Sequence, residues 1–236
     1  MKLLIALLLA CVAISATAAK PENVTEGETA LLPPYCVDTE WWKGGPRYSN
    51  HMSPRAPYWE SLMGDGFYWM HHYCAALVDL RRSQMFLPGS DKKRYLLQAV
   101  KMEITFTIAQ VSKKFVLLPE MYTRLGEAEI QLSDIGGAYD ALSRAREIKP
   151  DYWPAYSTWA EVLIRLKKKA EAKKLVREGL EYSPDSKVLL DQYKSLGGDP
   201  KEIQPVKKPG PAIDATESTE PAPAAPASTP ASDKTN

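Results

Sequence analysis

The chain has 236 residues, 44% of them hydrophobic and 25% charged, and its formal net charge is +1 because 30 Lys and Arg face 29 Asp and Glu. Such a balance lacks the excess of basic residues that is typical of nucleic-acid-binding proteins. Three Cys and three His are too few for a disulfide-rich scaffold or a metal-rich protein. We therefore expect one folded domain with extensions, with no nucleic-acid partner and no cofactor.

The first 19 residues have the pattern of a secretory signal peptide. A positive charge at Lys2 precedes a short apolar run, and a small-x-small cleavage site ends at Ala18. The apolar run is too short to predict a membrane span. We expect cleavage near Ala18 and a periplasmic or secreted mature protein. A lipid anchor at Cys11 is the alternative, because the residues before it resemble a bacterial lipobox, but apolar residues continue beyond it.

Residues 20–65 are predicted to form an irregular, aromatic-rich lid. Ten of the chain's 22 aromatic residues lie between Tyr35 and Tyr73, and Gly and Pro residues interrupt regular structure among them. An array of helices leaves an apolar face open at its end. Large rings can cover such a face at a modest cost in side-chain entropy. We expect the lid to cover the N-terminal end of the helices that follow.

Cys36 and Cys74 flank the aromatic region and are the two cysteines that remain after signal cleavage. Two cysteines in an exported protein most simply form a disulfide. The bond would close a loop of 38 residues and stabilise the fold by about 4 kcal/mol in the chain-entropy model. We therefore predict a disulfide between Cys36 and Cys74.

The same region supports a second interpretation, a metal- or small-ligand-binding site. His71 and Cys74 are three residues apart on a predicted helix and share a face, so with Cys36 they could hold zinc or copper. No Cys-x-x-Cys or His-Glu-x-x-His spacing is present, and packing or hydrogen bonding is favoured for His71 and His72. The Trp and Tyr rings of the lid could alternatively stack on a glycan, although packing is again the favoured interpretation.

Residues 66–118 are predicted to form a helical pair that spans residues 66–84 and 91–113. In the second helix, apolar residues recur three to four positions apart, as in an amphipathic helix. The pair lacks the consensus pattern found further along the chain. We interpret it as a degenerate repeat or a repeat-like cap.

Residues 119–198 contain a 34-residue repeat, marked by Pro150 and Pro184, each of which follows an amphipathic helical stretch. Large and small residues occupy equivalent offsets in the two copies: Tyr122, Leu125, Gly126, Ala138, Leu142 and Ala145 in the first, and Tyr156, Trp159, Ala160, Ala172, Val176 and Gly179 in the second. Two antiparallel helices approach closely where a small residue faces a large one. A further helix, from Ser186 to Leu196, is predicted to cap the C-terminal end.

This pattern resembles the tetratricopeptide repeat (TPR) family, whose unit is a 34-residue helix–turn–helix. The match includes the usual consensus positions except one aromatic per copy, which is replaced by Glu129 and Leu163. The resemblance implies an all-α array of about two consensus repeats, with the degenerate N-terminal pair and the capping helix at its ends. With its signal peptide, the chain is similar to exported bacterial TPR proteins.

The resemblance also implies binding to another protein, since the first helices of TPR units line a concave groove that accepts a partner's peptide or helix. By register, the groove-facing residues would be Glu120, Thr123, Glu127, Gln131, Pro154, Ser157, Glu161 and Arg165. The lysines and asparagines with which some members clamp a C-terminal carboxylate are absent, and Glu127 and Glu161 would repel that group. We therefore expect a scaffold or adaptor for an envelope or secreted protein, such as an assembly factor.

Residues 199–236 are predicted to form a disordered Pro/Ala-rich tail. From Pro200 onward there are eight Pro and no aromatic residue, so the segment buries too little apolar surface to offset the entropy of ordering. Elsewhere the chain shows no Gly-x-Ser-x-Gly motif, phosphate-binding loop or dinucleotide fingerprint. We therefore expect a protein without enzymatic activity.

Overall fold

The computed structural model describes residues 24–39 and 53–206, and this part of the chain contains helices and no strand. The all-α class predicted from the sequence is thus confirmed for the described residues. The α-helices are α1 Glu26–Ala30, α2 Ala56–Met63, α3 Met70–Ser83, α4 Asp91–Gln110, α5 Leu118–Gln131, α6 Ile135–Ile148, α7 Trp153–Arg165, α8 Lys169–Tyr182 and α9 Lys187–Ser195. Three 3-10 helices accompany them: η1 Pro34–Asp38, η2 Gly64–Trp69 and η3 Pro200–Glu202.

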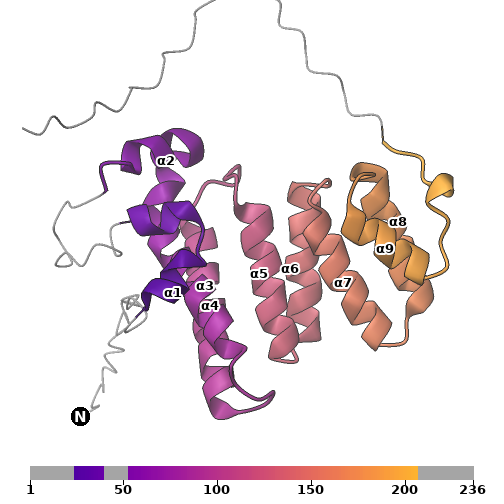
Figure 1. The fold of residues 1–236 in the computed structure, drawn as a ribbon, viewed down its shortest axis with the longest axis horizontal. Helices are drawn as coiled ribbons and strands as arrows, with labels where there is room; N and C mark the ends of the chain where they lie inside the picture. The colour runs from indigo at the N-terminus through magenta and orange to yellow at the C-terminus, as the bar shows by residue number, and fades with distance from the viewer. Residues whose placement is uncertain (1–23, 40–52, 207–236) are drawn as a thin grey trace, which may run out of the picture. The chain divides into compact units, whose positions relative to one another are not determined.

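The long helices pair into hairpins that pack side by side in chain order (Figure 1). The hairpins are α3–α4, α5–α6 and α7–α8. Successive hairpins pack through α4 with α5 and through α6 with α7, and the last hairpin packs through α8 on the single helix α9. Helix α5 also contacts α7, and α7 contacts α9. The α5–α6 hairpin therefore lies between the other two, and the turns within the three hairpins lie along one edge of the array (Figure 1).

The turns of the second and third hairpins have the same backbone geometry 34 residues apart. Ser133 and Lys167 both adopt positive φ, of 66° and 64°. The following residues close the turns with equivalent hydrogen bonds, from Asp134 N–H to the Glu129 carbonyl at 2.9 Å and from Lys168 N–H to the Leu163 carbonyl at 2.8 Å. The sequence period is thus matched by a period in the backbone.

The core consists of two clusters of buried side chains. The first joins the lid, α3, α4 and α5, and the second joins α6, α7, α8 and α9, while Tyr122 packs against both. The predicted pairing of small with large residues is confirmed at two glycines. A Cβ atom at Gly126 would lie 2.7 Å from Leu142 Cγ, and one at Gly179 would lie 2.8 Å from Tyr156 Cγ.

The lid is more regular than we expected, because its described residues include α1, η1 and α2. The sequence contains the signals for them. Thr25 and Glu28 form a capping box at the start of α1, and Pro residues occupy the first turns of η1 and α2. The prediction of irregular structure gave too little weight to these signals. Trp41, Trp42, His51, Cys11 and the expected cleavage site lie outside the described residues.

The C-terminal segment is also ordered further than we expected. The predicted disordered tail began at residue 199, but Asp199 caps η3 and Ile203 packs against the second core cluster. Both contacts belong to residues that composition alone assigned to the tail. Residues 207–236 lie outside the described part. Within that part, no helix is both long enough and apolar enough to cross a bilayer.

Candidate functional site

Cys36 on η1 and Cys74 on α3 form a disulfide, as predicted, with Cα atoms 5.7 Å apart. Both residues are fully buried. Because the two sulfurs are bonded to each other, neither can act as a thiolate ligand in the alternative metal site. Among the described residues, no group of three or more His, Cys, Asp or Glu side chains is placed to hold a metal ion.

His71 and His72 are buried and hydrogen-bonded, as the favoured interpretation predicted. His71 Nδ1 lies 2.9 Å from the carbonyl oxygen of Tyr68, and His72 Nδ1 lies 2.6 Å from Glu103 Oε2. Burial, aided by the neighbouring His72, lowers the pKa of His71 to about 4. Phe106 packs on His72 with ring centroids 4.5 Å apart. The contacts of His72 join α3 to α4, whereas the hydrogen bond of His71 joins the start of α3 to η2.

The aromatic rings of the lid divide into packed and exposed ones. Trp59 donates from Nε1 to Asp38 Oδ2 at 2.7 Å and meets Tyr35 edge-on, with ring centroids 6.0 Å apart. These contacts hold α2 on η1. Tyr58 and Tyr68 are more than half exposed, and the alternative of glycan stacking stays a prediction for such rings.

The residues predicted to face the groove come from α5 and α7, but two of them are buried. Thr123 is 2% exposed, and its hydroxyl donates to the Pro119 carbonyl at 2.8 Å. Ser157 is 6% exposed, and its carbonyl accepts a hydrogen bond from Gln192 of α9 at 3.4 Å. Register alone did not account for the cover that neighbouring helices provide at these positions.

Glu120 and Glu127 take part in a polar cluster that also contains Tyr73 and Arg124. The Tyr73 hydroxyl donates to Glu120 Oε1 at 2.9 Å, and Arg124 Nη1 donates to Glu127 at 3.0 Å. Burial, followed by the charge of Glu120, raises the pKa of Tyr73 well above its usual value. Sequence analysis missed Tyr73, because only the tertiary structure brings this residue of α3 to Glu120 of α5. It also missed Arg124, although the three-residue spacing of Arg124 and Glu127 on one helix was a signal that could have found it.

Of the other predicted residues, Gln131, Glu161 and Arg165 are exposed and Pro154 is half-buried. Gln131 at the end of α5 and Arg165 at the end of α7 line one cavity of about 320 Å³. The structure thus brings together two predicted residues from successive repeats, 34 positions apart in the chain.

The walls of this cavity come from all three hairpins. Its apolar lining consists of Ile130, Ile135, Val162 and Leu166, and Lys93 and Pro88 reach it from α4 and the α3–α4 loop. Its charged and polar lining consists of the two cations Lys93 and Arg165 and the amide of Gln131. Of its residues, the sequence analysis identified Gln131 and Arg165 alone; the others, such as Lys93, Ile135 and Leu166, were missed because they lie near turns that meet only in the stacked array.

Comparisons of this chain with protein-family models, curated proteins and solved structures found no match. The likeness to the TPR family therefore stays a prediction that rests on the sequence pattern. The helical hairpins, their shared turn geometry and the cavity are observations of the structure and do not depend on a family assignment.

Proposed function

We propose that the chain is an exported, non-catalytic TPR-like scaffold that binds another protein through the surface of α5 and α7. The observation that carries the proposal is the cavity into which Gln131 and Arg165 project from successive hairpins. Both were predicted from register as partner-binding positions. A shared hollow at the ends of neighbouring helices is a common location for a binding site between helices.

The TPR-like part of the proposal is supported by the repeated backbone. The 34-residue sequence period recurs in the positive φ values of Ser133 and Lys167 and in the hydrogen bonds that close their turns. The contacts of α5 with α7 and of α7 with α9 place the first helices of successive hairpins next to each other. Such stacking is how repeat proteins form extended binding surfaces.

The exported location is supported by the disulfide. A buried Cys36–Cys74 bond is expected in oxidising compartments, such as the periplasm or the exterior of the cell, and is rare in the cytosol. This agrees with the signal peptide predicted for the first 19 residues. A periplasmic or secreted partner follows from the same reasoning.

The test exchanges two exposed charges on α7, in the variant Glu161→Lys with Arg165→Glu. The two residues are four positions apart on one helix, so the exchange preserves the net charge and the spacing of opposite charges. Reversing their order at the C-terminal end of α7 costs the helix about 1 kcal/mol or less, so the fold should be retained. We expect recovery of the partner from an envelope extract, measured by quantitative mass spectrometry, to fall about tenfold. Glu127 is left unchanged because it pairs with Arg124.

The matched control exchanges an ion pair on α8, Arg177→Glu with Glu181→Arg. These residues are 3.3 Å apart and also four positions apart, but α8 lies outside the proposed surface. Recovery of the partner by the control should equal that of the unmodified protein. If the α7 variant also recovers the partner at the unmodified level, the proposed surface is wrong.

A further inference from the structure

The cavity at the ends of α5 and α7 shows what chemistry a partner would need, and the following inference rests on the proposed function. We infer that it receives one bulky aliphatic or aromatic side chain of the partner, flanked by carboxylates. The partner segment is therefore acidic and amphipathic.

The walls of the cavity expose apolar surface that the fold leaves uncovered. Leu166 is 47% exposed and Ile135 is 38% exposed, while Val162 between them is buried. Exposed apolar side chains that gather around a hollow mark binding sites, whereas scattered ones are ordinary. An apolar side chain of a partner would remove these walls from water, as an anchor residue does at the centre of an interface.

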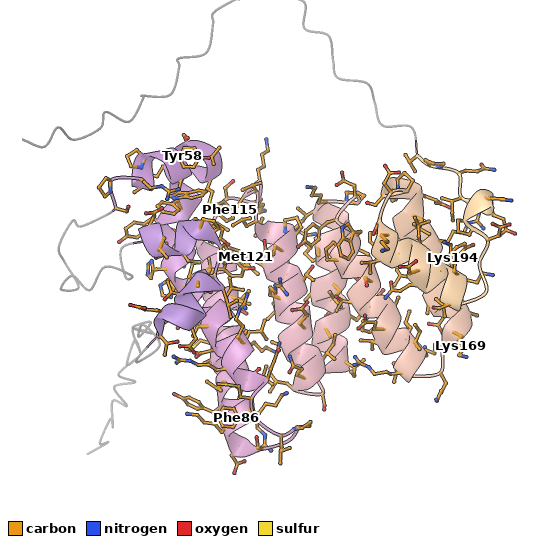
Figure 2. The ribbon with its side chains drawn as sticks, in the orientation of Figure 1. Tyr58, Phe86, Phe115, Met121, Lys169 and Lys194 are labelled. Carbon is orange, nitrogen blue, oxygen red and sulfur yellow. A yellow bond between two sulfur atoms is a disulfide. The ribbon has the colours of Figure 1, made fainter. Side chains whose placement is uncertain are left out.

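The loop between α3 and α4 extends this apolar surface. Pro88 lines the cavity, and Leu87 and Met85 of the same loop are 80% and 73% exposed. Phe86 of this loop and Lys169 at the start of α8 lie on the edge where the hairpin turns gather (Figure 2). A partner segment that crosses this edge would meet the loop before it reaches the cavity.

The charges at the cavity are positive and come from both sides. Lys93 belongs to α4 and Arg165 to α7, on either side of the α5–α6 hairpin. In the described part of the chain, neither cation has an acidic partner within ion-pair distance. The nearby acids Glu129 and Asp134 are both engaged by Lys101, at 3.0 and 3.2 Å. Carboxylates on a partner would complement the two remaining cations, and this complementarity favours an acidic segment over a basic or neutral one.

The size of the cavity limits the anchor to one side chain. Its volume of about 320 Å³ lies at the lower end of the range for ligand pockets, about 300 to 1,000 Å³. A cavity of this size suits a single large residue of a peptide. The exposed walls and the two cations would then contact the residues on either side of it.

The experiment selects peptides from a random dodecapeptide library on the disulfide-bonded mature chain. We expect the enriched sequences to carry one large apolar residue with Asp or Glu close by. The best peptide is then labelled, and its affinity is measured by fluorescence anisotropy for two variants, Lys93→Glu and the double substitution Ile135→Ser with Leu166→Ser. Each should weaken binding about tenfold, as expected when an anchor or its charge partner is lost.

The variants are chosen to leave the fold intact, and each has a matched control on α9. Lys93 is the third residue of α4, which Ser90 caps, so a glutamate there completes a capping box and favours the helix. The control for charge is Lys187→Glu and the control for apolar surface is Val188→Ser, both at exposed positions of α9. The controls should change the affinity less than twofold.

Enrichment of peptides without acidic residues, failure to enrich any peptide, or unchanged affinity of the Lys93→Glu variant would each overturn the inference. Tighter peptide binding after deletion of residues 207–236 would also overturn it, by assigning the cavity to the chain's own acidic segment around Ile213. Self-association that Lys93→Glu abolishes would assign it to a second copy. None of these variants changes Glu161 or Arg165, so the inference can fail while the pull-down test of the proposed function succeeds.

Discussion

Gly126 lies where α5 packs most closely on α6. A Cβ atom at this position would lie 2.7 Å from Leu142 Cγ, closer than non-bonded carbon atoms approach in folded proteins, and 3.1 Å from Leu142 Cδ2, which is a tight contact. Leu142 is fully buried, so it has little room to move away. The absence of a side chain at Gly126 therefore sets the distance between the two helices.

Gly126→Ala should destabilise the protein by about 1 kcal/mol. Overpacking a core typically costs about 1–3 kcal/mol, and the higher helix propensity of alanine returns up to about 1 kcal/mol. The free energy of unfolding, measured by urea denaturation of the purified mature chain, tests this expectation.

The control is Gly136→Ala, near the start of α6. A Cβ atom there would meet only Asp134 Oδ1, at 3.9 Å, so the gain in helix propensity should appear alone and stabilise the protein by up to about 1 kcal/mol. Equal effects of the two substitutions would show that close packing is not what requires glycine at Gly126.

At the scale of elements, the disulfide joins a short 3-10 helix to the first long helix. Five residues of η1 cannot form a stable helix alone, since isolated helices of this length are marginal. The bond from Cys36 to Cys74 and the contact between Tyr35 and Trp59 hold η1, and through it α2, on α3. The lid is thus held on the fold by a covalent link, ring contacts and polar contacts, which include the ion pair between Arg82 of α3 and Glu28 of α1.

Cys36→Ala with Cys74→Ala should lower the free energy of unfolding by about 4 kcal/mol, because the open chain regains the entropy of a 38-residue loop. Urea denaturation measures the loss, and the reduced form of the unmodified protein should behave like the variant. Hydrogen exchange should quicken in η1 and the first turns of α3 and change little in α7 and α8, which belong to the other core cluster. A loss below about 1 kcal/mol would contradict the loop-entropy account.

At the scale of the whole molecule, the two core clusters make the described chain a linear stack. The first cluster includes the lid and the α3–α4 hairpin, and the second ends at α9, where Leu189 and Tyr193 are buried. Each hairpin contacts chiefly its neighbours. In such arrays the stability is approximately the sum of contributions from the units and from the interfaces between neighbours. A destabilising substitution at one end should therefore loosen that end and leave the other end unchanged.

Leu189→Ala should cost about 2–5 kcal/mol, because it leaves a cavity between α8 and α9. The loss should appear as faster hydrogen exchange in α8 and α9, while α3 and α4 keep their protection. Val188→Ala, at a position that is 41% exposed, is the control and should change stability by less than about 0.5 kcal/mol. Uniform loss of protection along the whole chain after Leu189→Ala would show instead that the stack unfolds as one unit.

Much of the helical array could be predicted from the sequence, because the information is local. Apolar periodicity located α4, and the period of 34 residues located α5 to α8. Ser90 and Ser186 cap α4 and α9, and such capping residues are a further local signal in the sequence. The lid and the segment after residue 199 were less predictable. Their order depends on single contacts, such as the packing of Ile203, which composition does not reveal.

The residues of the candidate site were likewise predictable only in part. The repeat register identified Gln131 and Arg165, because equivalent positions in successive units face the same side. It also selected Thr123 and Ser157, which are buried, since a register specifies a face of one helix and not the cover that other helices provide.

The sequence by itself determined helices α3 to α9, their order and the pairing of Cys36 with Cys74, since periodicity and the count of cysteines act along the chain. Only the tertiary structure decided that Lys93, Ile135 and Arg165 surround one cavity. These residues come from three hairpins, and the distances between hairpins are set by side-chain packing, such as that of Gly126 on Leu142. Packing depends on how side chains that are far apart in the sequence fit together in the fold, and no local sequence pattern specifies that fit.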